Sequence, residues 1–209
     1  MAWTVFFLTL FTYLAPAQML HTRTALVTVT PSTLLVHNST FNPSEKVDGP
    51  SVFLGLLGSC SRVKNNAHVG CTNASTHPVY NLSVLPSRAP SHFLSASQAA
   101  AIAAAVGLSF SYAFFVGHTL QAFNIKYLDQ PVLHHFIAFF GVMGFLIGLT
   151  VFLVMRLWLG KAVDDFNLIV SDQGTKGPQL IASVGNGFII VWFAYAFHTA
   201  PLYVSMVRL

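Results

Sequence analysis

The two cysteines are the first residues whose type and placement suggest chemistry. Cys60 and Cys71 are the only cysteines in the chain, and they flank a polar segment rich in basic and amide side chains. A close pair in an oxidising compartment is typical of a disulfide, and closing so short a loop contributes about 3 kcal/mol in the chain-entropy model. A metal site would need partners such as His68 or His77. We predict the disulfide and keep the metal site as the less favoured alternative.

Three N-glycosylation sequons lie in the same part of the chain. Asn38, Asn73 and Asn81 each precede a serine or threonine by two positions, whereas Asn42 is excluded by the proline that follows it. An N-glycosylation acceptor needs access to the secretory lumen. Because all three sequons fall in one segment and none elsewhere, we predict that this segment is lumenal or extracellular.

A small acidic cluster is the one candidate for cation binding. Asp164 and Asp165 are adjacent, and Asp172 follows them. Carboxylate oxygens are ligands for hard cations such as Ca²⁺, but the spacing matches no calcium-loop signature. Because Lys161 and Lys176 are close in sequence, a solvated, charge-balanced loop is the favoured interpretation and a weak cation site the alternative.

Few residues in this sequence could act in catalysis. There is no Gly-x-Ser-x-Gly, no His-Glu-x-x-His and no glycine-rich phosphate loop, and the acidic residues number six. The histidines at 118, 134, 135 and 198 are expected near helix ends within reach of water, where they serve as pH sensors or, more simply, have no chemical role. We therefore expect a protein that is not an enzyme and has no cofactor and no bound metal.

The composition points to a membrane protein. The chain of 209 residues is 54% hydrophobic and 8% charged, against about 25% charged residues in globular proteins. No Asp, Glu, Lys or Arg occurs in 1–22, 89–125, 130–155 or 177–207. This excludes soluble-enzyme and disordered classes. The net charge of +4 is carried by scattered basic residues, so no nucleic-acid partner is expected.

Four segments are apolar enough to be helices that cross a bilayer, which takes about 20 residues. We predict spans at 1–20, 95–119, 132–155 and 180–203. The first is equally consistent with a cleaved signal peptide, because a small-x-small pattern follows its apolar core. The predicted connections are a lumenal segment at 21–94, a cytoplasmic loop at 120–131, a second extracellular loop at 156–179 and a cytoplasmic tail at 204–209.

The orientation rests on the sequons and cysteines, because the positive-inside rule opposes it. Only Lys126 and Arg208 would be cytoplasmic, and eight basic residues would lie outside. Within the lumenal segment, Ala25–Val36, Ser51–Leu57 and Val79–Leu85 have the β-branched or alternating pattern of short strands. We therefore predict a small antiparallel sheet on a helical bundle.

Small residues recur at every fourth position in two of the predicted spans. They are Ser95, Ala99, Ala103, Gly107 and Ser111 in one span, and Gly144 and Gly148 in the next. Such ridges let helix backbones approach closely. The favoured interpretation is packing within the bundle, and the alternative is an oligomer face.

A short motif before the first cysteine gives a resemblance. Gly55, Leu56, Gly58 and Cys60 form a Gly-Leu-x-Gly-x-Cys stretch, and Cys71 follows. With three helices downstream, the chain resembles the fungal claudin-like tetraspan membrane proteins, which include the PalI-type and eisosome-associated family and the related mating-fusion, low-affinity calcium-uptake family. Phe53 and Leu57 stand where animal claudins carry tryptophan, so the resemblance does not extend to tight-junction strands.

Together these features predict an all-α membrane bundle of four transmembrane helices, with a signal peptide as the alternative for the first, and a small antiparallel β extracellular subdomain of claudin-like fold. The resemblance implies a plasma-membrane protein that organises membrane domains, senses the cell surface, or supports mating-associated calcium entry and fusion. The expected partners are the lipid bilayer and other membrane proteins, in homo- or hetero-oligomers. The alternatives are an accessory subunit of a larger membrane complex and a weak cation pathway.

Overall fold

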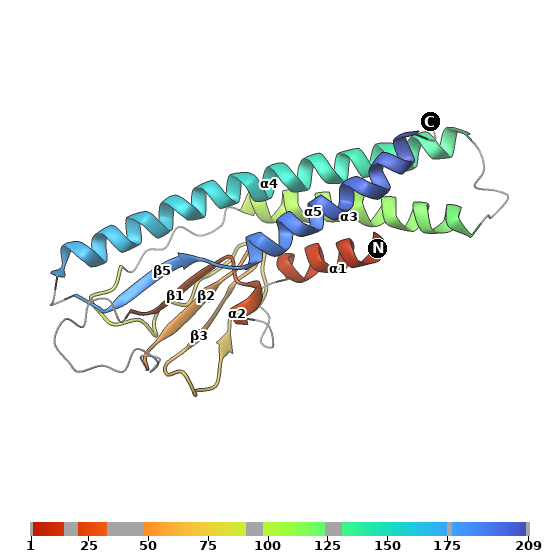
Figure 1. Cartoon of the computed structure of the whole chain (residues 1–209). Helices are drawn as coiled ribbons and strands as arrows, with labels where there is room; N and C mark the ends of the chain where they lie inside the picture. Colours follow the sequence, from red (N-terminus) through yellow and green to blue (C-terminus); the bar gives the residue numbers. More distant parts are fainter. Residues whose placement is uncertain are drawn as a thin grey trace.

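A computed structural model describes residues 2–14, 21–32, 48–90, 98–123, 131–174 and 177–207. The molecule is elongated, with a helical bundle at one end and a small sheet at the other (Figure 1). The helices are α1 Ala2–Tyr13, α2 His21–Thr24, α3 Gln98–Ala122, α4 Pro131–Asp172 and α5 Gly187–Val207. The strands are β1 Val27–Pro31, β2 Ser51–Leu54, β3 Ser59–Arg62, β4 Gly70–Cys71 and β5 Leu180–Val184.

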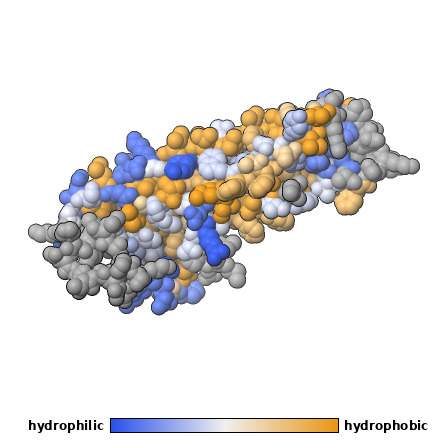
Figure 2. All heavy atoms as spheres, viewed as in Figure 1, coloured by the Kyte–Doolittle hydropathy of each residue, from blue (hydrophilic) through white to orange (hydrophobic). Residues whose placement is uncertain are grey.

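Three helices, α3, α4 and α5, are long and apolar enough to cross a membrane. Helix α1 is apolar but shorter. Exposed side chains along the helices are mainly hydrophobic, and Figure 2 shows hydrophobic residues over the helical body with hydrophilic residues gathered toward the ends. A surface of this kind is stable in lipid rather than in water. The expected fold class is therefore present in its coarse form, a mainly helical membrane protein with a small antiparallel sheet.

The sheet has five strands in the order β4-β3-β2-β1-β5, and every neighbouring pair is antiparallel. Strand β5 comes from the segment between α4 and α5, so the sheet joins two distant parts of the chain. The register pairs Thr28 with Ser183 on one side and with Phe53 on the other. The two hydroxyls of the first pair are hydrogen-bonded across the strands at 2.8 Å.

The predicted loop at 156–179 is corrected by the length of α4. The helix continues to Asp172, and its buried side chains in this part follow helical spacing at Leu159, Val163, Phe166 and Val170. The described charges of this segment lie on the helix: Lys161, Asp164, Asp165 and Asp172 are exposed, and Arg156 is half-buried. At 1.5 Å per residue, the 42 residues of α4 span about 63 Å, about twice the hydrocarbon thickness of a bilayer.

The predicted span at 180–203 is also corrected at its start. Leu180–Val184 is strand β5, with alternating buried and exposed residues, and helix α5 begins only at Gly187. Its apolar composition matches a membrane span equally well, so hydropathy did not separate the two. The predicted strand at Val79–Leu85 is absent, because these described residues form turns and extended backbone.

One continuous hydrophobic core runs from the bundle into the sheet. It combines bundle residues such as Phe152, Met155 and Tyr195 with inward-facing strand residues such as Val29 and Leu54. The second half of α4 lies along the sheet and supplies much of this core (Figure 1). Because a packed core transmits displacement rather than absorbing it, the sheet and the bundle behave as one body.

Candidate functional site

The candidate site is the sheet together with α4 from Arg156 onward, which we call the sheet unit. From Arg156 to Asp172 the helix extends about 25 Å at 1.5 Å per residue. Arg156 is the first charged residue of α4, and its guanidinium lies 5.7 Å from the ring centroid of Phe188 at the start of α5. Long basic side chains at such a position reach from apolar surface to water. Arg156 therefore marks the level at which the sheet unit leaves the bundle.

The predicted disulfide is present. Cys60 and Cys71 are bonded with an S–S distance of 2.03 Å and connect β3 to β4. Cys60 is fully buried against Phe53 and Ala25, with Val69 packed beside them, whereas Cys71 is exposed. The bond therefore links the two-residue edge strand covalently to β3.

The glycine motif forms the connection between β2 and β3. The amide of Gly55 donates to the carbonyl of Gly58 at 2.9 Å, and the hydroxyl of Tyr80 donates to the Gly55 carbonyl. A Cβ at Gly58 would lie 2.6 Å from the Thr72 hydroxyl, so this position needs glycine. Leu56 between them is fully buried in the core below the sheet. The motif residues act in folding this hairpin and in docking it on the bundle.

Two contacts that the sequence did not reveal fix the sheet to the helices. The side-chain amide of Asn167 donates to the carbonyl of Ala182 at 2.9 Å and accepts from the amide of Ala182 at 2.8 Å. Asn167 thus pairs with β5 as a neighbouring strand would. An isolated asparagine in an apolar helical pattern carries no sequence signal of this role.

The second contact is the passage from β5 to α5. The amides of Gly185 and Gly187 donate to the carbonyls of Leu26 and Ala25 at 2.8 and 3.0 Å. Added Cβ atoms at both glycines would collide with the backbone of residues 24–26. Glycine here lets two backbones touch, which ties the start of α5 to the segment that leads into β1.

An arginine network stands on the other face of the sheet. The guanidinium of Arg62 lies 5.5 Å from the ring centroid of Phe53 and donates to the backbone carbonyl and side chain of Asn65. The amide of Asn65 donates to the Asp48 carboxylate at 2.7 Å. This network orders the turn between β3 and β4, and its polar groups give this face a water-compatible surface.

The predicted glycosylation sites are placed in part. Asn73 and Asn81 are exposed, which an acceptor site requires. Asn38 lies outside the described residues. In Asn81 the side-chain carbonyl accepts from the amide and the hydroxyl of Ser83, at 3.1 and 2.6 Å.

The predicted cation residues are placed on the surface. Asp164 and Asp165 are both exposed on α4, as is Lys161. Among the described residues, no group of three or more His, Cys, Asp or Glu side chains is close enough to hold a metal ion. The favoured interpretation, a solvated loop, is corrected in part: these residues are solvent-exposed, but on a helix rather than a loop.

The small-residue ridges meet inside the bundle. A Cβ on Gly107 would lie 3.0 Å from the backbone nitrogen of Gly148, and a Cβ on Gly144 would lie 2.7 Å from that of Ser111. These four residues therefore bring α3 and α4 into backbone contact. Of the remaining positions in the α3 ridge, Ala99 is exposed, Ala103 is half-buried and Ser95 lies outside the described residues.

One histidine differs from its predicted position. His198 is 1% exposed, and its Nε2 has no hydrogen-bond partner. Its ring stacks on Phe114 at 5.4 Å between centroids and lies 4.9 Å from Phe115, with Phe145 at 5.8 Å. It is a core residue of the bundle rather than a water-accessible one. Helical spacing alone did not show it, because α5 is apolar on all sides.

Helix α1 packs into the same bundle. Val5 and Thr12 are buried, and the indole of Trp3 donates to the hydroxyl of Thr119 on α3 at 3.1 Å. The rings of Trp3 and Phe6 also contact Tyr112, at centroid distances of 6.2 and 5.3 Å. These contacts place α1 in the bundle beside α3.

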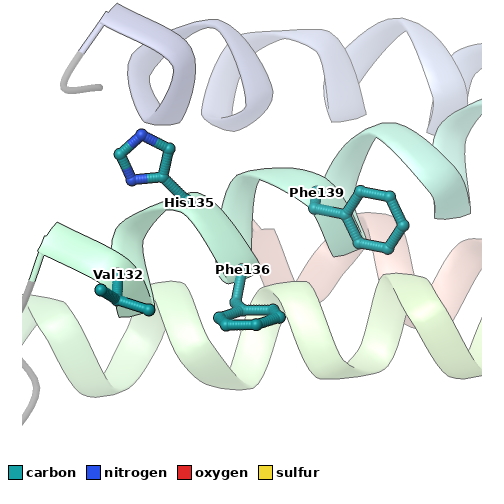
Figure 3. Close-up of a pocket in the computed structure, with 4 residues that line it drawn as sticks. All are labelled: Val132, His135, Phe136 and Phe139. Carbon is teal, nitrogen blue, oxygen red and sulfur yellow. The ribbon is translucent and has the colours of Figure 1, made fainter.

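An apolar pocket of about 450 Å³ lies near the beginning of α4. It is lined by Val132, His135, Phe136 and Phe139, four side chains along one stretch of the helix (Figure 3). The three hydrophobic side chains are exposed, and they belong to a segment apolar enough to span a membrane. Lipid acyl chains are the ordinary contacts of such a surface, and we assign no ligand to it.

The chain was compared with models of protein families and with curated protein sequences. No family model matches it, and no curated protein matches it.

Proposed function

We propose that this protein is a non-enzymatic membrane organiser, which presents the sheet unit outside the plasma membrane and regulates or gathers partner membrane proteins. The observation that carries the proposal is the continuous core between sheet and bundle. A loop on a flexible tether would leave partner orientation to chance. A sheet packed on a helix that projects about 25 Å from the bundle holds its outer surface at a fixed height and angle.

The proposed orientation places the sheet unit outside and the α3–α4 connection in the cytoplasm. Three features support it. The disulfide between Cys60 and Cys71 belongs to an oxidising compartment. Asn73 and Asn81 are exposed in the segment after β4. All charged residues of α4 lie from Arg156 onward, in the part of the helix that packs along the sheet. Delivery through the secretory pathway and four spans, with α1 retained, are parts of this proposal.

The proposed family is that of the fungal claudin-like tetraspan proteins. Its support is the Gly-Leu-x-Gly-x-Cys motif, whose residues build the β2–β3 hairpin, and the disulfide that follows it. The family setting would make membrane-domain organisation, sensing or mating-associated calcium entry the processes to examine first.

Impermeant cross-linking on intact cells tests the proposal. Lys64 is exposed in the turn between β3 and β4, so an amine-reactive, membrane-impermeant cross-linker should capture neighbouring membrane proteins through it. Lys64→Arg keeps the charge but removes the reactive amine, and it should lose those adducts. Adducts that appear only after permeabilisation would contradict the orientation. Labelling of Lys64 in intact cells with no adduct beyond the protein itself would contradict the partner-binding function.

An accessory subunit of a larger complex is the second candidate. Large aromatic side chains are exposed on the bundle, including Phe136, Phe139, Phe193 and Phe197, and these would fit grooves of a permanent partner. Native electrophoresis after mild solubilisation separates the two functions. A stoichiometric large complex indicates a subunit, and a small species with transient partners indicates an organiser.

A further inference from the structure

We propose that Asn73 carries an N-linked glycan that shields the open edge of the sheet against strand addition. This inference rests on the proposed orientation, since the glycan is added in the secretory lumen. Exposure alone does not distinguish Asn73 from Asn81, whereas this inference gives Asn73 a role of its own. The argument comes from the unequal protection of the two sheet edges.

The β5 edge is closed by the protein itself. Asn167 on α4 makes both a donated and an accepted hydrogen bond with the backbone of Ala182, and α4 packs along this strand. A further strand therefore has no access to the centre of β5.

The β4 edge has no such cover among the described residues. Gly70 and Cys71 are both exposed, and β4 is the last strand of the sheet. The amide of Thr72 donates to the carbonyl of Ser59 at 2.8 Å, so the neighbouring pair of Cys60 and Cys71 is of the non-hydrogen-bonded kind. Its Cα atoms are 4.0 Å apart, in keeping with the closer spacing of such pairs. The backbone amide and carbonyl of Cys71 therefore face away from β3, toward the free edge.

An exposed strand edge is a template for pairing with another chain, and proteins protect such edges with short strands, charges or covering groups. The disulfide makes this edge permanent, because β4 cannot detach from β3 while Cys60 and Cys71 are bonded. A second copy of the protein in the same membrane presents the same edge at the same height. The described residues place no covering group on this edge beyond the shortness of β4 itself, so a bulky group beside it would add protection.

Asn73 stands where such a cover is needed. It is exposed, and it follows Cys71 by two positions. The chain around it is well fixed, because the Thr72 hydroxyl accepts from the amide of Ser59 at 2.9 Å and the amide of Ser75 donates to the carbonyl of Leu57 at 2.9 Å. A bulky, hydrated group on Asn73 would stay beside the edge rather than move away with a loose loop.

The modification is a group transfer from an oligosaccharide linked to a polyisoprenoid diphosphate. A bond forms between the Asn73 side-chain nitrogen and the anomeric carbon of the first sugar. The bond from that carbon to the diphosphate oxygen breaks, the diphosphate leaves with the electron pair, and the amide nitrogen loses one proton. No oxidant or reductant takes part.

Asn81 supplies the matched control. It is also exposed, but it lies further along the chain after β4 than Asn73 does, and its amide donates to the Ser59 hydroxyl at 2.8 Å. A glycan on Asn81 reports the lumenal orientation without occupying the β4 edge. Loss of that glycan should leave self-association unchanged.

The experiment uses the full chain, expressed in eukaryotic cells, with glycosidase treatment and cross-linking in isolated membranes. Asn73→Gln and Ser75→Ala should each lower the apparent mass of the wild-type band by one glycan. Each should also raise the fraction of cross-linked dimer several-fold. Ser75→Thr keeps the sequon and should match the wild type. His68→Lys places a charge beside the exposed edge and should return the dimer of Asn73→Gln to the wild-type level.

Each contrary outcome has a distinct meaning. A glycan on Asn81 with none on Asn73 overturns the inference and leaves the proposed orientation intact. Absence of glycan from Asn38, Asn73 and Asn81 alike overturns the inference and removes the support that the sequons give to the orientation. A glycan on Asn73 whose removal leaves the dimer fraction unchanged overturns the shielding role.

Discussion

Replacement of Asn167 should loosen the sheet from the bundle by a measurable amount. The Asn167 side chain makes two hydrogen bonds with the backbone of Ala182, at 2.8 and 2.9 Å. Each is worth about 0.5–1.5 kcal/mol net, so Asn167→Ala should lower the free energy of unfolding by about 2 kcal/mol. For a chain of this size, that corresponds to a fall in Tm of about 4–8 °C. Asn167→Asp keeps the acceptor but loses the donor, and should be at least as destabilising.

Thermal unfolding of the detergent-solubilised protein measures the global effect, and amide hydrogen exchange at Ala182 measures the local one. A loss of about 2 kcal/mol in local opening raises the exchange rate about 30-fold. Ser171→Ala is the control, since Ser171 lies one turn further along α4, is exposed and bonds only within its helix. Unchanged Tm and unchanged exchange at Ala182 in Asn167→Ala would refute the view that this side chain holds β5.

Three further predictions concern the bundle. A Cβ on Gly148 would overlap the Tyr195 hydroxyl, so Gly148→Ala should cost about 1–3 kcal/mol by overpacking; Tyr195→Phe in the same chain should recover part of the lost Tm, and no recovery would contradict the contact. His198→Phe removes a buried polar atom without a partner and should raise Tm by the equivalent of about 1–3 kcal/mol; a lower Tm would show that the imidazole has a partner in the membrane. The hydrogen bond from Trp3 to Thr119 predicts that α1 is retained, so N-terminal sequencing of the mature protein should begin before Trp3, and a start after residue 17 would contradict it.

The sequence predicted the parts of the fold whose signal is local. The disulfide followed from two cysteines in a polar segment, and the three long helices followed from hydropathy. The ridge residues Gly107 and Gly148 were predicted to pack inside the bundle, and they lie where α3 and α4 touch. In each case the relevant property, such as charge or side-chain size, is visible in one short window.

The parts that were missed depend on distant partners. Leu180–Val184 is a strand because β1 lies beside it. The paired residues are far apart in the sequence: Thr28 and Ser183 are separated by 155 positions. Asn167 is important because Ala182 is near it, and His198 is buried because α3 and α4 surround it. Apolar composition is common to membrane helices and buried strands, so no window of the sequence separates these cases.

Two junctions between the sheet and the helices would transmit the effect of partner binding under the proposed function. Asn167 fixes β5 to α4, and Gly185 and Gly187 fix the start of α5 to the segment before β1. A partner that binds the sheet unit therefore acts on two membrane helices at once, while the contacts between α3 and α4 resist their separation. Under the proposed function, partner binding to the sheet unit and the helix arrangement would then be linked, and each would change the other by the same free energy. Because the hydrophobic core still joins the sheet to α4 in Asn167→Ala, this variant should weaken the coupling between partner binding and bundle arrangement rather than abolish it.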